Sequence, residues 1–120
     1  MRRTSAATFL AAILLAAGLA TAEEGADIRR AREGFDQGVE LLQRGDLRAA
    51  LAEFERAHEI APNFVVLYNL GVVNARLHRY PDALAYLERY LAEGGELVPD
   101  ARRSEVMEEI GRLRRLVGRI

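Results

Sequence analysis

The feature that most constrains the fold of this chain is an internal repeat. When the sequence is shifted against itself so that residue 38 falls on residue 71, seven positions between 38 and 56 carry the same residue as their equivalents. This displacement, here called the repeat shift, places Gly38-Val39 on Gly71-Val72, Ala50-Leu51-Ala52 on Ala83-Leu84-Ala85, and Glu55-Arg56 on Glu88-Arg89. A period of about 33 residues, with apolar residues spaced by three and four, is typical of stacked pairs of helices. The 120 residues are enough for one such domain at most.

Turn residues divide the chain into five predicted helices and no strand. Pro62 disfavours helical backbone at the residue before it, and Asn63 can cap the next helix. Pro81 suits a first helical turn, and Gly94-Gly95 can end a helix. The predicted helices run from about Asp27 to Arg44, Leu47 to Ile60, Asn63 to Leu77, Pro81 to Gly94, and Pro99 onward.

The repeat resembles the tetratricopeptide repeat, a unit of two helices with small residues where they touch. The second unit matches through Tyr68-Asn69-Leu70-Gly71, Tyr80, Ala83 and Leu87, and the first through Gly38, Leu41, Gly45-Asp46, Ala50, Phe54, Ala57 and Pro62. Gly34, Tyr90 and the lack of a proline after the second unit depart from the family pattern. The resemblance implies an all-α, right-handed solenoid of helical hairpins. Its parts would be a lead segment (23–30), two repeats (31–63 and 64–95) and a capping or partial third-repeat helix (99–118).

Two sets of residues follow from the resemblance. The predicted repeat-packing residues are Gly38, Ala50, Phe54, Ala57, Pro62, Gly71, Tyr80, Ala83 and Leu87. The family binds peptides on a concave face, and the equivalent candidate groove residues are Arg32, Phe35, Val39, Leu42, Gln43, Val65, Tyr68, Val72, Ala75 and Arg76. This mostly apolar set suits an apolar peptide or helix with an acidic end. The alternative is that some of these residues only pack against the neighbouring helix.

The residues that catalysis requires are scarce. Cys is absent, and beyond position 22 the chain contains no Thr and one Ser, Ser104, among charged residues. His58 lies on the second predicted helix beside Glu55 and Glu59 but lacks a third placed metal ligand, and His78 lies in a turn. We therefore expect no catalytic residue, no metal, no cofactor and no small-molecule substrate. The basic residues, all Arg, nearly balance the acidic ones at a net charge of −1, so no nucleic-acid partner is expected.

The N-terminal segment 1–22 has the anatomy of a secretory signal peptide. Arg2-Arg3 precedes an apolar run from Ala6 to Ala20, and Ala20-Thr21-Ala22 is a small-x-small cleavage site. The run is shorter than the roughly 20 residues that span a bilayer, so cleavage after Ala22 is favoured over an uncleaved membrane anchor. The prediction is a protein exported to the periplasm or the extracellular space.

The sequence thus favours a non-catalytic scaffold or adaptor of the bacterial cell envelope that binds a protein or peptide of unidentified kind. Two repeats and one helix form a short array, and Val106, Ile110, Leu113 and Val117 could leave an apolar end. A self-associating homo-oligomeric module is therefore one alternative. The N-terminal part of a longer exported multidomain protein is another.

Overall fold

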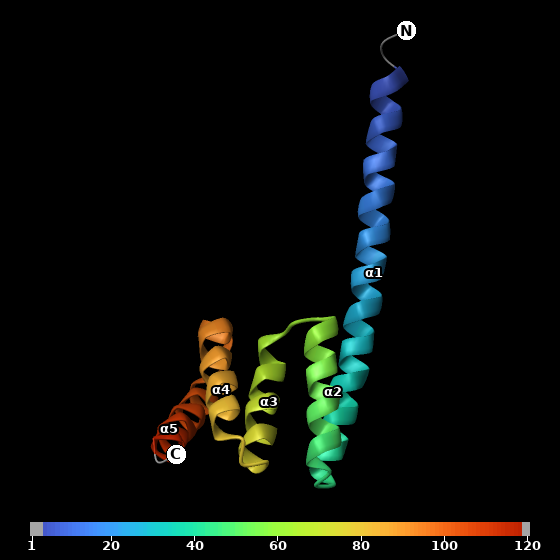
Figure 1. Ribbon diagram of the computed structural model, residues 1–120. Helices are drawn as coiled ribbons and strands as arrows, with labels where there is room; N and C mark the ends of the chain where they lie inside the picture. Colours follow the sequence, from blue (N-terminus) through green and yellow to red (C-terminus); the bar gives the residue numbers. More distant parts are fainter. Residues whose placement is uncertain (1–3, 119–120) are drawn as a thin grey trace.

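The chain is all-helical over the part that the structure describes. The computed structural model describes the backbone of residues 4–118 and the side chains of residues 21–118. It contains α1 (Thr4–Gln43), α2 (Leu47–Ile60), α3 (Phe64–Arg76), α4 (Tyr80–Gly94), a short 3₁₀ turn η1 (Gly95–Leu97) and α5 (Asp100–Val117) (Figure 1). The predicted all-α class and the five predicted helices are confirmed, with no strand in residues 4–118.

The start of α1 differs from the prediction. The helix begins at Thr4 instead of near Asp27, and its N-terminal part extends well beyond the other helices (Figure 1). The change from apolar to charged residues near Glu23 marks a change in composition, but it includes no proline and no helix-ending turn. Ala, Leu and Glu all favour helix, so the backbone continues through this point. The Arg2-Arg3 pair of the predicted signal peptide lies outside the described residues. Within the described part of the chain, no helix is both long and apolar enough to cross a membrane.

The predicted helix boundaries after α1 follow local chemistry. The side chain of Asn63 accepts a hydrogen bond from the backbone N–H of Val65 over 2.9 Å and caps α3, as predicted. Pro81 occupies the first turn of α4, where its missing N–H costs no hydrogen bond. Gly95 follows α4 with φ +50°, a left-handed conformation that suits glycine.

The repeat shift is also present in the backbone of the two turns that end α1 and α3. Gly45 has φ +79°, and His78, its equivalent under this shift, has φ +59°. Both turns close with the same two hydrogen bonds of a Schellman motif. In the first turn, the N–H of Gly45 donates to the carbonyl of Leu42 (3.0 Å) and the N–H of Asp46 to the carbonyl of Leu41 (3.0 Å). In the second turn, the N–H of His78 donates to the carbonyl of Ala75 (3.1 Å) and the N–H of Arg79 to the carbonyl of Asn74 (2.9 Å). The two pairs of helices therefore turn in the same way.

The same shift relates the closest contacts within the two helix pairs. A Cβ atom added to Gly38 on α1 would lie 2.6 Å from Cε1 of Phe54 on α2. A Cβ atom added to Gly71 on α3 would lie 2.5 Å from Cδ2 of Leu87 on α4. Each glycine thus leaves the space that a large side chain of the following helix fills.

The core runs through α2, α3, α4 and α5 as one cluster of buried side chains. Each helix packs mainly on its neighbours in the chain, so α3 lies between α2 and α4. The largest fully buried side chains are Phe54, Leu67, Leu70, Val73, Leu87, Val106 and Leu113. The apolar side chains of α1 that pack against this cluster, including Phe35 and Val39, are only partly buried. Gly38 of the same helix is buried. The N-terminal helix therefore covers one side of the core.

Candidate functional site

The predicted groove residues lie in two separate clefts instead of one continuous groove. The first, here called the α1–α3 cleft, has a volume of about 450 Å³, and its lining includes Arg32, Phe35 and Val65. The second, the α3–α5 cleft, has a volume of about 350 Å³. The predicted residues that line it are Tyr68, Val72, Ala75 and Arg76.

The other three predicted groove residues line neither cleft. Val39 and Leu42 are half-buried and pack against the core, which fits the alternative of a packing role. Gln43 is exposed at the end of α1. The structure therefore brings together three predicted residues in one cleft and four in the other.

The α1–α3 cleft is open and mostly apolar. Ile28 and Val65 remain 52% and 44% exposed, so two aliphatic side chains of the lining reach solvent. Phe35 is half-buried, and its ring centroid lies 5.6 Å from that of Phe54, a fully buried residue of the core. Pro62 and Asn63 line the cleft where the chain passes from α2 to α3.

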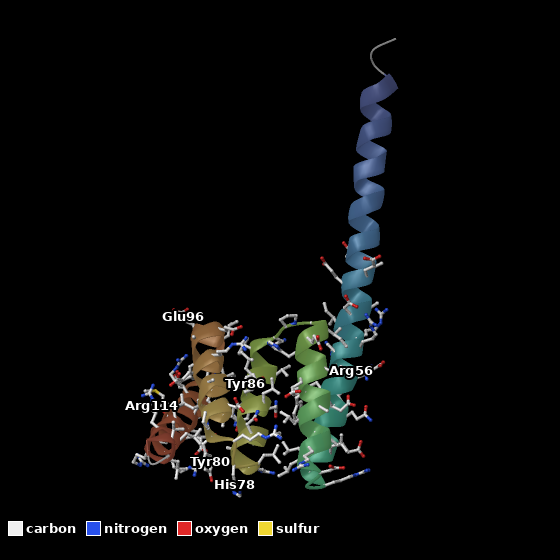
Figure 2. All side chains as sticks on the ribbon, viewed as in Figure 1. Arg56, His78, Tyr80, Tyr86, Glu96 and Arg114 are labelled. Atoms are coloured by element: carbon white, nitrogen blue, oxygen red, sulfur yellow. The ribbon has the colours of Figure 1, made fainter. Side chains whose placement is uncertain are left out.

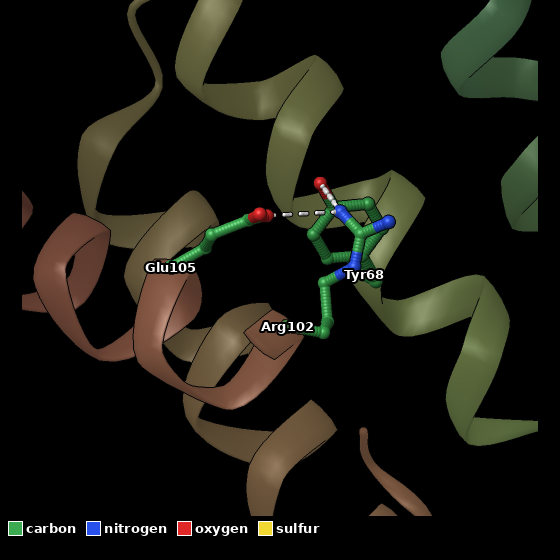
Figure 3. A network of polar contacts seen from close by, with 3 residues as sticks. All are labelled: Tyr68, Arg102 and Glu105. Carbon is green, nitrogen blue, oxygen red and sulfur yellow. Dashed lines mark hydrogen bonds and ion pairs between the residues drawn. The ribbon is translucent and has the colours of Figure 1, made fainter. Parts of the chain in front are cut away.

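In the α3–α5 cleft, Tyr68 is held between two other side chains. Its ring centroid lies 5.5 Å from that of Tyr90 on α4. The guanidinium carbon of Arg102 on α5 lies 4.2 Å from the ring centroid, a cation–π distance, and Arg102 also donates to the Tyr68 hydroxyl. Arg102 in turn reaches Glu105 at 3.4 Å (Figure 3). Tyr68 is therefore a fixed wall of the cleft.

The sequence prediction missed the contribution of α5 to this cleft. Glu105, Val106, Glu109 and Arg112 line the side of the cleft opposite α3. A partial third repeat, one of the two predicted identities of segment 99–118, would have placed these residues beside α3. The predicted groove residues belong to the first two units only, so the prediction includes no residue of α5.

The charges around the α3–α5 cleft are unequally paired. Arg112 binds Glu109 through two hydrogen bonds of 2.9 and 2.5 Å, and these bonds raise the pKa of the Arg112 guanidinium. Glu105 faces Arg102, whereas Arg76 is exposed and forms no ion pair with any side chain of residues 21–118. The available positive charge at this cleft is that of Arg76.

The predicted repeat-packing residues divide by burial. Tyr80 is half-buried and Pro62 is exposed. The buried members are Gly38, Ala50, Phe54, Ala57, Gly71, Ala83 and Leu87. Pro62 lies in the connection between α2 and α3, so it directs the chain instead of filling space between helices.

A third, more polar cleft of about 380 Å³ is lined by residues of α2, α3 and α4, including Glu55, Asn74, Asp82 and Tyr86. Tyr86 lies on α4 (Figure 2). Partial burial raises the pKa of its phenol, and the nearby Glu55 carboxylate raises it further. Asn74 is buried, and its side-chain amide donates to the carbonyl of Leu70 over 2.7 Å. Within the described residues, no three acidic or histidine side chains are grouped closely enough to hold a metal ion.

The remaining candidates for chemistry are isolated. Ser104 is exposed on α5, and His78 is exposed in the turn before α4, where its ring lies 5.8 Å from that of Tyr80. His58 has a buried Nε2 atom without a hydrogen-bond partner in the described part of the molecule. None of the side-chain hydrogen bonds of residues 22–118 joins Ser104 to a base.

No protein-family model matches the chain, and no curated protein matches it.

Proposed function

We propose that the chain is a tetratricopeptide-type solenoid that acts as a non-catalytic scaffold or adaptor and binds a peptide or helix. The repetition of the turn at Gly45 and His78 supports the family resemblance, as does the repeated contact of Gly38 with Phe54 and of Gly71 with Leu87. In such an array α1, α3 and α5 are the first helices of successive units. The α1–α3 and α3–α5 clefts then lie on the face that the family uses for binding.

The α3–α5 cleft is the proposed peptide site, and its composition carries the proposal. Val72, Ala75 and Val106 provide an apolar lining, and Tyr68 is fixed by its neighbours. A wall that is already ordered costs little conformational entropy when a ligand binds. Arg76 contributes an unpaired positive charge at the edge. The fitting ligand is an apolar segment with one acidic group.

Export to the bacterial cell envelope belongs to the same proposal. It rests on the charged, apolar and small-x-small pattern of residues 1–22. Isolation of the chain from cells and sequencing of its first residues would test it. A chain that starts at Glu23 supports export with cleavage, and a chain that keeps Met1 in the cytoplasm contradicts it.

Peptide binding can be tested with peptides selected from a random library on the full chain. Affinities of the selected peptides would be measured by fluorescence anisotropy. We expect Arg76→Glu to weaken binding of an acidic peptide by about tenfold or more, since an attractive charge becomes a repulsive one. Arg48→Glu, the same change at an exposed site on α2 that lines neither cleft, should leave the affinity unchanged.

A second variant separates the apolar contribution. Val72→Ala removes two methyl groups from the lining and should weaken every selected peptide, acidic or not. Phe35 and Tyr68 are poorer test positions, because both pack on the core and their removal would also destabilise the fold. Peptides that bind Arg76→Glu and Val72→Ala as tightly as they bind the natural chain would have their site outside the α3–α5 cleft. This result would contradict the proposal.

A further inference from the structure

One face of α1 combines an exposed apolar residue with two unpaired charges. Ile28 is 52% exposed, and Glu24 and Arg32 are exposed one turn before and one turn after it. Residues four apart lie on the same face of a helix, so the three side chains form a short stripe. Ile28 and Arg32 also line the α1–α3 cleft, together with Phe35 one turn further along the helix.

Neither charge of the stripe is paired with another side chain of residues 21–118. Arg30, on another side of α1, pairs with Asp27, but neither Glu24 nor Arg32 forms an ion pair with another described side chain. The stripe therefore has an acid at one end, a base at the other and an apolar centre. This arrangement is complementary to itself when the direction of the helix is reversed.

We propose that this face binds the same face of a second copy of the chain, with the two α1 helices antiparallel about a two-fold axis at Ile28. Ile28 of each copy then packs on Ile28 of the other. Glu24 of each copy faces Arg32 of the other, so the symmetry forms the ion pair twice. The partner is thus identified by charge complementarity and by the apolar centre.

The shape of the molecule leaves room for this contact. The N-terminal part of α1 extends beyond α2 (Figure 1), so an antiparallel second copy would place its own bundle at the far end of the helix pair. In the same register Gly25 faces Ala31 of the other copy. A Cβ atom on Gly25 would approach only its own Arg29 side chain, at 3.7 Å, so this side of the helix is open to a close neighbour.

The contact is independent of the two features proposed above. Its central residues, 24–32, follow the predicted cleavage point at Ala22, so they remain whether or not the signal is removed. It uses α1, whereas the proposed peptide site lies between α3 and α5. Failure of one proposal therefore leaves the other standing.

Cysteine cross-linking of the full chain tests the position of the two-fold axis. The natural chain has no Cys, so a single introduced thiol gives an unambiguous product. Ile28→Cys should form a disulfide-linked dimer rapidly under mild oxidation. Glu33→Cys is the matched control, because it is exposed on the same helix but points about 140° away from Ile28. Equal cross-linking of the two variants would overturn the proposed face.

Charge exchange tests the register. In the Ile28→Cys background, Glu24→Arg or Arg32→Glu places like charges opposite each other twice and should reduce the homodimer about tenfold. A mixture of the two variants restores both attractive pairs, so the heterodimer should form as readily as the original homodimer. Its mass distinguishes it from either homodimer. A heterodimer no more abundant than the homodimers would overturn the antiparallel register.

Discussion

At the scale of single residues, Gly38 and Gly71 set the distance between the helices of each pair. Gly71→Ala would place a methyl group 2.5 Å from Cδ2 and 2.7 Å from Cγ of Leu87, which is 2% exposed and has little room to move. The cost of overpacking, about 1–3 kcal/mol, should exceed the gain of about 1 kcal/mol in helix propensity. We expect urea unfolding to show a net loss of stability.

Gly111 is the matched control for this substitution. It lies within α5, and an added Cβ would approach only the Arg115 side chain, at 3.8 Å. Gly111→Ala should therefore stabilise the protein by about 0.5–1 kcal/mol through helix propensity. If Gly71→Ala raised the unfolding free energy as Gly111→Ala does, the contact between α3 and α4 would be looser than described.

The substitution His78→Gly should stabilise the protein, because His78 has φ +59° in a turn where the equivalent residue is Gly45. A left-handed conformation costs a residue with a side chain about 1–2 kcal/mol, and glycine avoids this cost but loses more backbone entropy on folding. His78→Gly also removes the ring contact with Tyr80. The balance should be a stabilisation of about 0.5 kcal/mol, measured by thermal unfolding. Gly45→Ala should destabilise by about 1 kcal/mol, and the opposite order of the two effects would contradict the turn geometry.

At the scale of elements, α5 should be held by one apolar stripe. Leu113 is fully buried, and Val106 and Ile110 are nearly so, whereas Met107 is 59% exposed. Leu113→Ala should cost about 2–5 kcal/mol, because it leaves a cavity against α4. Met107→Ala, a similar truncation on the outer face, should change the unfolding free energy by less than about 0.5 kcal/mol. Comparable losses for the two variants would mean that α5 packs through a different face.

The helices could be predicted where the sequence contains a residue that stops a helix. Pro62, Asn63 and the glycines at 94 and 95 act locally, so the end of α2, the start of α3 and the end of α4 follow from the sequence. The start of α1 could not be predicted in this way, because the change of composition near Glu23 does not interrupt helical backbone. The composition of a segment indicates whether its surroundings are apolar or aqueous. Its backbone conformation depends instead on helix propensity and on residues that end a helix.

The clefts were less predictable than the helices. The repeat shift makes Tyr68 the equivalent of Phe35, but it does not predict that a side chain from another helix covers one of the two rings. Arg102 does so for Tyr68, through a contact between α3 and α5. Contacts of this kind depend on the angle between helices, which no local pattern of residues encodes.

At the scale of the whole molecule, the core is continuous from α2 to α5, and α3 is its centre. Six of the 13 residues of α3 are buried, and the helix packs on both α2 and α4. In contrast, residues 23–30 of α1 are exposed or half-buried, and Ile28 is half exposed. Because one cluster of buried side chains joins the two helix pairs, we expect unfolding by urea to be a single cooperative transition.

Amide hydrogen exchange should resolve this gradient of stability. The amides of Leu67–Asn74 can exchange only when the whole core opens, so their exchange should follow the global unfolding free energy. The amides of residues 23–30 can exchange when the end of α1 frays, at least about a hundredfold faster.

The Glu24→Arg variant should be used for this measurement, because a second copy bound at Ile28 would itself protect α1. Leu67→Ala, which creates a cavity in α3, should accelerate exchange in all of α2–α5 and leave residues 23–30 almost unchanged. Acceleration confined to α3 and α4 would instead show that the two helix pairs unfold separately.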